Sequence, residues 1–258
     1  DTPIFILCGG LGTRLKEETE FKPKPMVPVG KDPIVTHIIR KYNKHGFRKF
    51  VLCLGYRADV IKAYFRNYCN LNSDFTADLS NSKITTHSVD HDLNIEVTLA
   101  YTGELTMTGG RIGRATEKYL NGVEHFGITY GDGLTDVDLD AHFEYHLNHD
   151  KIGTVLGINP PSRFGELKCE GDLINGFEEK PDISDHWVNG GYFFFRKDFT
   201  NYLSTDEDCI LERAPLANLV KDKQLKMNKH AGFWACMDTQ REREQLNKIW
   251  DSGKAPWL

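Results

Sequence analysis

The sequence predicts an α/β fold with a mixed, mostly parallel β-sheet and helices on both of its faces. Short apolar runs of strand length alternate with longer segments in which apolar residues recur at helical spacing. Strands that are separated by helices pair in parallel, and such a sheet is covered on both faces. At 258 residues, 40% of them hydrophobic, the chain is long enough to form this core as a single domain.

The first quarter of the chain sets this pattern. Residues 3–8 form a continuous apolar run, as expected of a strand that is buried on both faces. Asp32 precedes a proline and is expected to cap a helix over 33–46. A strand at 48–55 and a helix at 58–68 follow, so the order of elements is Rossmann-like.

The later segments continue the alternation and become richer in strands. In chain order we expect strands at 82–88 and 95–103, a helix at 112–119, a strand at 125–133, a helix at 138–150, strands at 153–159, 165–170, 173–180 and 188–196, and helices at 209–222 and 239–252. The four strands between 153 and 196 predict a smaller, β-rich part. No internal repeat or linker divides the chain.

Composition argues against several classes of partner. The net charge is −5, from 32 basic and 37 acidic residues that are scattered along the chain, which disfavours a nucleic acid or a membrane surface. No apolar run approaches the roughly 20 residues that cross a bilayer. The chain opens directly into a strand, so we expect no signal peptide. Six cysteines without a C-x-x-C pair are typical of a cytoplasmic protein. The ten histidines show no metal-ligand spacing.

The loop after the first strand combines glycines with cations. It reads "GGLGTR" at 9–14, and Lys22 and Lys24 follow between prolines that restrict their backbone. Glycine-rich turns at the carboxyl end of a strand hold phosphate through backbone N–H groups. Fixed donors together with cations suit a triphosphate. We interpret the loop as a triphosphate site; the alternative is a tight turn with exposed basic residues, and the role of Lys22 is open.

Two other phosphate-binding patterns fit this loop poorly. The dinucleotide pattern G-x-G-x-x-G matches Gly10 and Gly12 but meets Leu15 at its third glycine. The pattern G-x-x-x-x-G-K-[ST] is absent from the sequence. An NAD-dependent oxidoreductase is therefore a weaker alternative.

The loop resembles the signature of the nucleoside-triphosphate:sugar-1-phosphate nucleotidylyltransferases, and the resemblance extends over the whole chain. It is carried by "KPKPMVPVG", "TGELTMTGGRIGR", "TYGDGLTDVDL", "RFGELK", "FEEKP", "VNGGYFFF", "GFWACMDTQRE" and "GKAPW". The segments "MTGGR" and "FWACMDT" resemble the cytidylyltransferase branch in particular. This resemblance implies that residues 1–135 mainly bind the nucleotide, whereas 136–258 mainly bind the sugar phosphate and supply the C-terminal helices.

The resemblance also implies the reaction. CTP and an α-D-glucose 1-phosphate-like sugar would give a CDP-sugar and pyrophosphate, by in-line attack of the sugar phosphate on the α-phosphorus. Another nucleotide (UTP, dTTP or GTP) or another sugar 1-phosphate remains an alternative. A catalytically silent sensor of nucleotide-sugars is a further one. The family forms multimers, so we expect a homo-oligomer, with 58–88 as a candidate contact.

Two aspartates are candidate ligands of Mg²⁺. Asp132 in "YGDG" and Asp238 in "CMDT" each follow an apolar segment. Either aspartate alone could belong to a turn, and Asp238 could cap the helix that follows it. Magnesium is usually held by one or two carboxylates together with substrate phosphates. The resemblance assigns metal binding to both residues.

The remaining site residues follow from the resemblance. The expected nucleotide-binding residues are Leu7, Gly9, Gly10, Gly12, Thr13, Arg14, Lys24, Thr108, Gly110 and Arg111. The expected sugar-phosphate-binding residues are Tyr130, Glu179, Lys180, Asn189 and Gly190. Catalysis is expected from Arg14, Lys24 and Asp132, through positioning and neutralisation of charge. Two structural alternatives stay open: Arg111 could face solvent from its helix, and "NGG" could be an ordinary β-turn.

Overall fold

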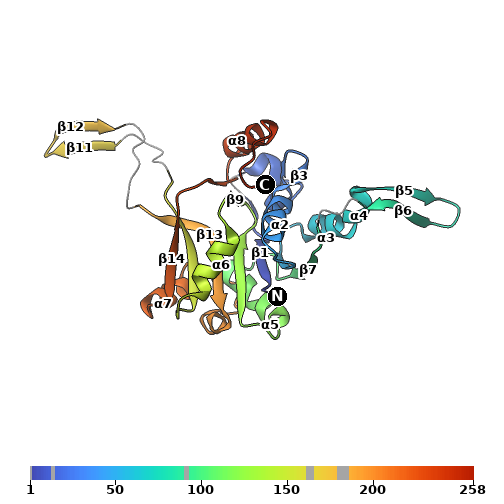
Figure 1. Ribbon diagram of the computed structural model, residues 1–258, viewed down its shortest axis with the longest axis horizontal. Helices are drawn as coiled ribbons and strands as arrows, with labels where there is room; N and C mark the ends of the chain where they lie inside the picture. Colours follow the sequence, from blue (N-terminus) through green and yellow to red (C-terminus); the bar gives the residue numbers. More distant parts are fainter. Residues whose placement is uncertain (1, 13–14, 90–92, 161–165, 179–185) are drawn as a thin grey trace.

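A seven-stranded sheet forms the centre of the protein (Figure 1). The computed structural model describes residues 2–12, 15–89, 93–160, 166–178 and 186–258. In spatial order the strands are β14 (Leu225–His230), β10 (Gly153–Ile158), β13 (Val188–Arg196), β8 (His125–Tyr130), β1 (Ile4–Cys8), β4 (Lys49–Leu54) and β7 (Glu96–Tyr101). Among these strands β13 alone runs antiparallel to its two neighbours. The predicted mixed, mostly parallel sheet is therefore confirmed.

Within the described residues, four small two-stranded sheets accompany the central one. They are β2 (Pro28–Val29) with β3 (Asp32–Pro33), β5 (Ser73–Asp78) with β6 (Lys83–Val89), β9 (Gly133–Thr135) with β15 (Trp234–Cys236), and β11 (Glu166–Glu170) with β12 (Leu173–Glu178). The β9–β15 pair lies next to the functional site, because it joins the segments that carry Asp132 and Asp238.

The helical segments are α1 (Lys16–Thr19), η2 (Lys24–Met26), α2 (Ile34–Lys44), α3 (Ala58–Arg66), α4 (Tyr68–Leu71), α5 (Thr108–Tyr119), α6 (Leu139–Leu147), η3 (Lys197–Tyr202), α7 (Ala214–Lys221) and α8 (Gln240–Asp251). Helices α2, α6 and α8 contribute to the core on one face of the sheet, and α5 and α7 to the core on the other. Among the described residues no helix combines the length and the apolar character that crossing a bilayer requires.

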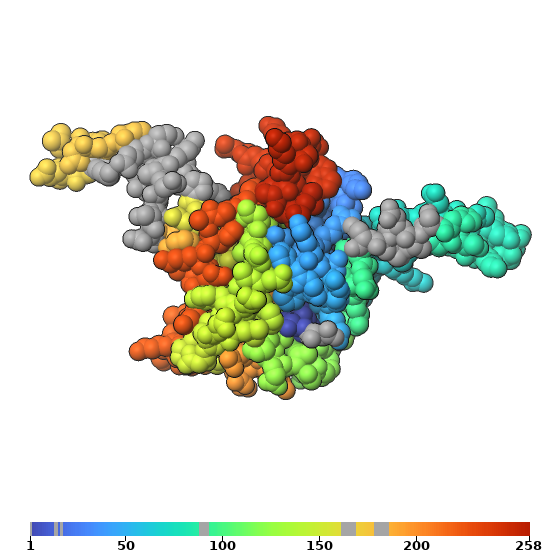
Figure 2. Space-filling view, viewed as in Figure 1, coloured from blue at the N-terminus to red at the C-terminus, as the bar shows by residue number. Residues whose placement is uncertain are grey.

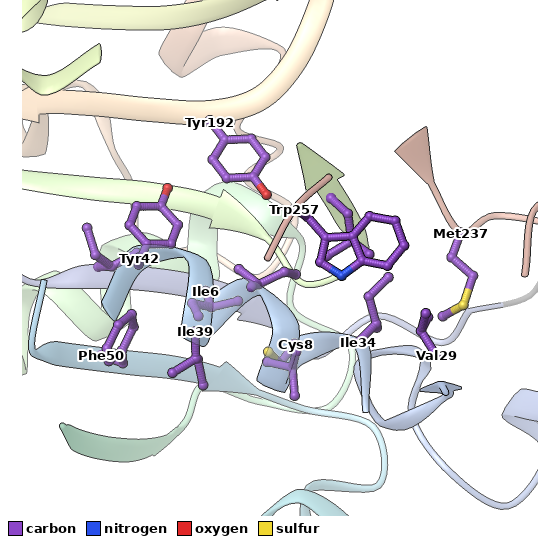
Figure 3. Close-up of a cluster of buried hydrophobic side chains, with 14 of the residues drawn as sticks. Ile6, Cys8, Val29, Ile34, Ile39, Tyr42, Phe50, Tyr192, Met237 and Trp257 are labelled. Atoms are coloured by element: carbon purple, nitrogen blue, oxygen red, sulfur yellow. The ribbon is translucent and has the colours of Figure 1, made fainter. Parts of the chain in front are cut away.

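The first strand explains how both faces are filled. Ile4, Ile6 and Cys8 point into one core, whereas Phe5 and Leu7 point into the other. Successive side chains of a strand alternate between faces, so a continuous apolar run is what two covered faces require. Figure 3 shows the first of these cores, where side chains of α2 lie close to Ile6 and Cys8.

Helix α5 begins earlier than the sequence predicts. It starts at Thr108 rather than near 112, although Gly109 and Gly110 are poor helix formers. A Cβ atom on Gly110 would lie 2.2 Å from the carbonyl oxygen of Asp206, and one on Gly113 would lie 2.4 Å from that of Ser204. The glycines therefore allow the helix to pack directly on the backbone of 204–211.

Some predicted elements differ in the structure. Asp32 does not cap α2; its carboxylate binds Arg40 at 2.5 Å, and Pro33 precedes the helix. The helix expected at 209–222 begins only at Ala214. Strands β5 and β14 were not predicted, and neither were the short strands β2, β3, β9 and β15.

Two hairpins extend from opposite sides of the body (Figures 1 and 2). The β5–β6 hairpin exposes Phe75, Leu79 and Ile84, and the β11–β12 hairpin exposes Leu173 and Phe177. Isolated two-stranded hairpins are at best marginally stable in water.

Candidate active site

One edge of the sheet gathers the predicted nucleotide-binding residues. A cavity of about 410 Å³ lies at the carboxyl ends of β1 and β8. Its lining includes Leu7, Gly9, Gly10, Gly12, Lys24, Thr108, Arg111, Tyr130 and Asp132. Gly110 instead packs against the backbone of Asp206. Thr13 and Arg14 lie outside the described residues. We call this space the first cavity.

A second cavity, of about 380 Å³, adjoins the first. Its lining includes Tyr130, Asp132, Asn189, Gly190, Glu212, Trp234 and Asp238. Tyr130 and Asp132 line both spaces, so the two cavities meet there. Glu179 and Lys180 lie outside the described residues.

Lys24 occupies the centre of the site. Its Nζ lies 2.5 Å from Asp132 Oδ2 and 2.5 Å from Asp238 Oδ1. Burial by itself would lower the pKa of Lys24, but the charges and hydrogen bonds of the two aspartates outweigh it and raise that pKa. The lysine is therefore a charged ammonium group bound between two carboxylates.

The proline-rich backbone positions this lysine. Lys24 begins the short helix η2, with Pro25 in its first turn and Pro23 in an extended conformation before it. The N–H of Met26 donates to the carbonyl of Pro23 at 2.8 Å. Lys22 instead forms a partly exposed ion pair with Glu18 at 3.4 Å. Lys24 is the lysine of this segment that reaches the aspartates.

Asp132 and Asp238 suit a divalent cation. Asp132 Oδ2 and Asp238 Oδ1 contact the same Lys24 ammonium, so these two oxygens lie close together. Thr239, not Asp238, caps helix α8, so the capping alternative for Asp238 is wrong. The neighbouring thiol of Cys236 has its pKa raised to about 12 by burial and by Asp238, so it stays protonated. Two close carboxylates without a thiolate form a hard, oxygen-based ligand set of the type Mg²⁺ prefers.

Arg111 supports the glycine loop through a hydrogen bond from the protein interior. It is 4% exposed, so the alternative that it faces solvent is wrong. Its guanidinium donates to the carbonyl oxygens of Gly9, Leu54, Gly103 and Glu104 and to the hydroxyl of Thr102. A Cβ atom on either Gly9 or Gly55 would lie 2.3 Å from this group, so a side chain at either position would displace the guanidinium.

The rest of the loop leaves backbone accessible. Gly12 has a φ of +62°, a conformation that favours glycine, and its carbonyl accepts a hydrogen bond from the Thr19 hydroxyl at 3.0 Å. A Cβ atom on Gly10 would meet nothing within 4 Å. This open backbone beside Lys24 is the arrangement that phosphate binding requires.

Asn189 lies beside Tyr130 at the start of β13. Its Oδ1 accepts a hydrogen bond from the N–H of Gly191 at 2.8 Å, and its Nδ2 lies 3.4 Å from the Tyr130 hydroxyl. Because Asn189–Gly191 belongs to β13, the interpretation of "NGG" as an ordinary β-turn is wrong.

Glu212 is a site residue that the sequence did not indicate. It lies before α7 and accepts hydrogen bonds from the hydroxyls of Tyr130 and Thr108. No motif marks it, because it reaches the site only through the packing of 204–211 against α5.

Comparisons with known proteins identify the family of the chain. The nucleotidyl transferase family model matches residues 4–238. The glucose-1-phosphate cytidylyltransferase of Salmonella typhi is 41% identical over 98% of this chain and 97% of its own length. The D-glycero-α-D-manno-heptose 1-phosphate guanylyltransferase of Campylobacter jejuni is 31% identical over 85% of this chain and 87% of its own.

A solved structure shares the fold. HddC from Yersinia pseudotuberculosis, complexed with GMP-PN, is 21% identical, covers 97% of this chain and 100% of its own, and superposes with a TM-score of 0.66. The extent of the family match and the 41% identity with the Salmonella relative are decisive. The chain belongs to the nucleotidyl transferase family.

Proposed function

We propose that this protein transfers the cytidylyl group of CTP to α-D-glucose 1-phosphate, giving CDP-glucose and pyrophosphate. The observation that carries the proposal is the Lys24 ammonium, bound by Asp132 and Asp238 where the two cavities meet. The choice of CTP and glucose rests on the Salmonella relative, whose name states both.

The reaction requires two anions to approach each other. A phosphate oxygen of the sugar 1-phosphate attacks the α-phosphorus of CTP, the bond to the β-phosphate oxygen breaks, and pyrophosphate leaves. The nucleophile is already ionised, so no general base and no covalent enzyme intermediate is needed. Catalysis then consists of positioning and neutralisation of charge, which a fixed cation supplies. We assign this role to Lys24.

Each of the two cavities would bind one of the two substrates. All the residues that line the first cavity precede residue 133, whereas Asn189, Gly190 and Glu212 line the second. CTP would occupy the first cavity, with its phosphates at the glycine loop, and the sugar 1-phosphate the second. Thr13, Arg14, Glu179 and Lys180 are assigned to phosphate and sugar binding on the family resemblance alone.

Asp132 and Asp238 would hold the Mg²⁺ ion. When bound, the ion would neutralise charge on the phosphates. Both carboxylates already bind the Lys24 ammonium, which supports their affinity for a cation.

A matrix of substrates tests the proposed function. Pyrophosphate release is measured with CTP, UTP, dTTP and GTP, each combined with several sugar 1-phosphates, with Mg²⁺ and after its removal by EDTA. We expect the highest kcat/KM for CTP with glucose 1-phosphate, and no turnover without the metal. Preference for another nucleotide or sugar would refute the specificity. Absence of release in every combination would refute the reaction.

We propose that the protein is a cytoplasmic homo-oligomer. Its six cysteines are free, which supports a reducing compartment. The exposed apolar residues of the β5–β6 hairpin, Phe75, Leu79 and Ile84, support a contact between copies of the chain.

Light scattering after gel filtration tests the oligomer. We expect a mass that is a multiple of the 29.4 kDa chain, and a smaller species for Ile84→Asp, because a buried charge opposes association. Lys83→Asp is the matched control, since it adds a carboxylate at a neighbouring polar position. A wild-type mass equal to one chain would refute the oligomer.

A further inference from the structure

Glu212 is held in the second cavity, beside Tyr130, by the packing of its segment on α5. The N–H of Met107 donates to the carbonyl of Glu207 at 2.7 Å, and the N–H of Gly110 donates to that of Cys209 at 3.0 Å. Leu211 donates its N–H to the Thr108 hydroxyl at 2.9 Å. These three bonds place the residue that follows Leu211 beside the N-terminus of the helix.

The two oxygens of Glu212 bind side chains that line the two cavities. Oε2 accepts a hydrogen bond from the Thr108 hydroxyl at 2.7 Å, and Thr108 lines the first cavity. Oε1 accepts a hydrogen bond from the Tyr130 hydroxyl, and Tyr130 lines both cavities. Thr108 therefore has no proton left to donate to a nucleotide, and its hydroxyl serves to hold the glutamate.

Tyr130 remains a donor in this network. Burial, followed by the charge of Glu212 and the hydrogen bond to it, raises the pKa of Tyr130. Its ring is held in place by the backbone of β13: a Cβ atom on Gly191 would lie 2.4 Å from Tyr130 Cδ2. Thr108, Glu212, Tyr130 and Asn189 thus form a continuous chain from one cavity to the other.

Glu212 also has acceptor capacity to spare. An ionised carboxylate accepts about four hydrogen bonds, and the two from Thr108 and Tyr130 leave room for more. Its side chain is exposed and lines the second cavity. The other two carboxylates of that lining, Asp132 and Asp238, bind the Lys24 ammonium instead.

Glu212 is therefore a carboxylate of the second cavity that is not bound to Lys24 and can accept further hydrogen bonds from a ligand. Its charge disfavours a phosphate in contact with it, whereas a hydroxyl can donate to it. A sugar 1-phosphate carries several hydroxyls beside its phosphate, so its hydroxyl side suits contact with Glu212.

We propose that Glu212 accepts a hydrogen bond from a ring hydroxyl of the sugar 1-phosphate and so determines which sugar is used. The inference rests on the proposed function and deepens it. Thr108 and Tyr130 hold this carboxylate in one position. The selection between sugars therefore depends on where the sugar carries its hydroxyl.

Deoxy-sugar analogues test this role. We would measure kcat/KM with glucose 1-phosphate and with its 2-, 3-, 4- and 6-deoxy analogues, for the wild type and for Glu212→Ala. The wild type should use one analogue about 10- to 100-fold less well than glucose 1-phosphate, the factor for one hydrogen bond to a charged group. Glu212→Ala should use that analogue and glucose 1-phosphate equally, and should keep the wild-type ratios for the other analogues.

Three comparisons make the result decisive. Asp208→Asn removes an exposed carboxylate from the same segment and should keep every wild-type ratio. Glu212→Gln keeps the shape of the side chain and should weaken the same preference. It therefore tests the inference even if the alanine variant does not fold. Tyr130→Phe removes one of the two hydrogen bonds that position the carboxylate and should weaken the same preference without abolishing it.

Two outcomes would overturn the inference, and they are distinguishable. If Glu212→Ala loses the same factor with every analogue, Glu212 only supports the structure, while the proposed function stands. If the wild type releases no pyrophosphate with any sugar 1-phosphate, the proposed function fails and the inference fails with it.

Discussion

Replacing Lys24 by alanine should lower kcat by about 10²- to 10³-fold, the usual effect of removing one preorganised charge-stabilising group. The two substrates of the proposed reaction are both anions, and Lys24 is the described cation where the two cavities meet. Its loss should therefore affect the transition state more than the binding of either substrate alone. Steady-state measurement of pyrophosphate release checks this.

The same variant should respond strongly to Mg²⁺. Without the ammonium, Asp132 and Asp238 are two like charges close together that no longer share Lys24, and a divalent cation would relieve their repulsion. Mg²⁺ should therefore raise the melting temperature of Lys24→Ala more than that of the wild type. Lys22→Ala is the matched control, since Lys22 pairs with Glu18, and it should behave like the wild type. Near-normal turnover in Lys24→Ala would contradict the assigned role.

Replacing Arg111 by alanine should have the largest effect on stability, with a loss of about 3–5 kcal/mol in the free energy of unfolding. Arg111 is buried, and its removal would leave four carbonyl oxygens and one hydroxyl without this partner. It would also release the carbonyl of Gly9, so kcat/KM should fall in the molecules that remain folded.

Urea unfolding checks the prediction for Arg111. Lys118→Ala, on the exposed face of the same helix, is the matched control and should change stability by less than about 0.5 kcal/mol. Arg111→Lys should restore only part of the loss, because an ammonium cannot make five fixed hydrogen bonds. A loss below about 1 kcal/mol for Arg111→Ala would contradict a structural role of this size.

The central fold was predictable because its interior strands are mostly apolar. The strand β1 is an example, since both of its faces are covered. The edge strand β14 was missed because most of "LKMNKH" is polar and partly exposed. The start of α5 was missed because its glycines are explained only by the distant backbone at 204–211. Local sequence does not contain that tertiary contact.

The candidate site was predictable where a motif marks it and not elsewhere. Asp132 and Asp238 are 108 and 214 residues from Lys24, and the family resemblance, not the local pattern, indicated that they act together. Arg111 lies in a recognised segment, but its contact with the glycine loop depends on the fold. Glu212 has no sequence signal, because the packing of its segment alone brings it to Tyr130.

The central claim is that nucleotidyl transfer to a sugar phosphate occurs where Lys24, Asp132 and Asp238 meet. The most direct test is ³¹P NMR of a reaction that contains the protein, CTP, glucose 1-phosphate and Mg²⁺. We predict that pyrophosphate and a sugar-linked diphosphate appear in equal amounts, and only when both substrates are present. Formation of CMP and pyrophosphate without a sugar nucleotide, or no consumption of CTP, would contradict the account.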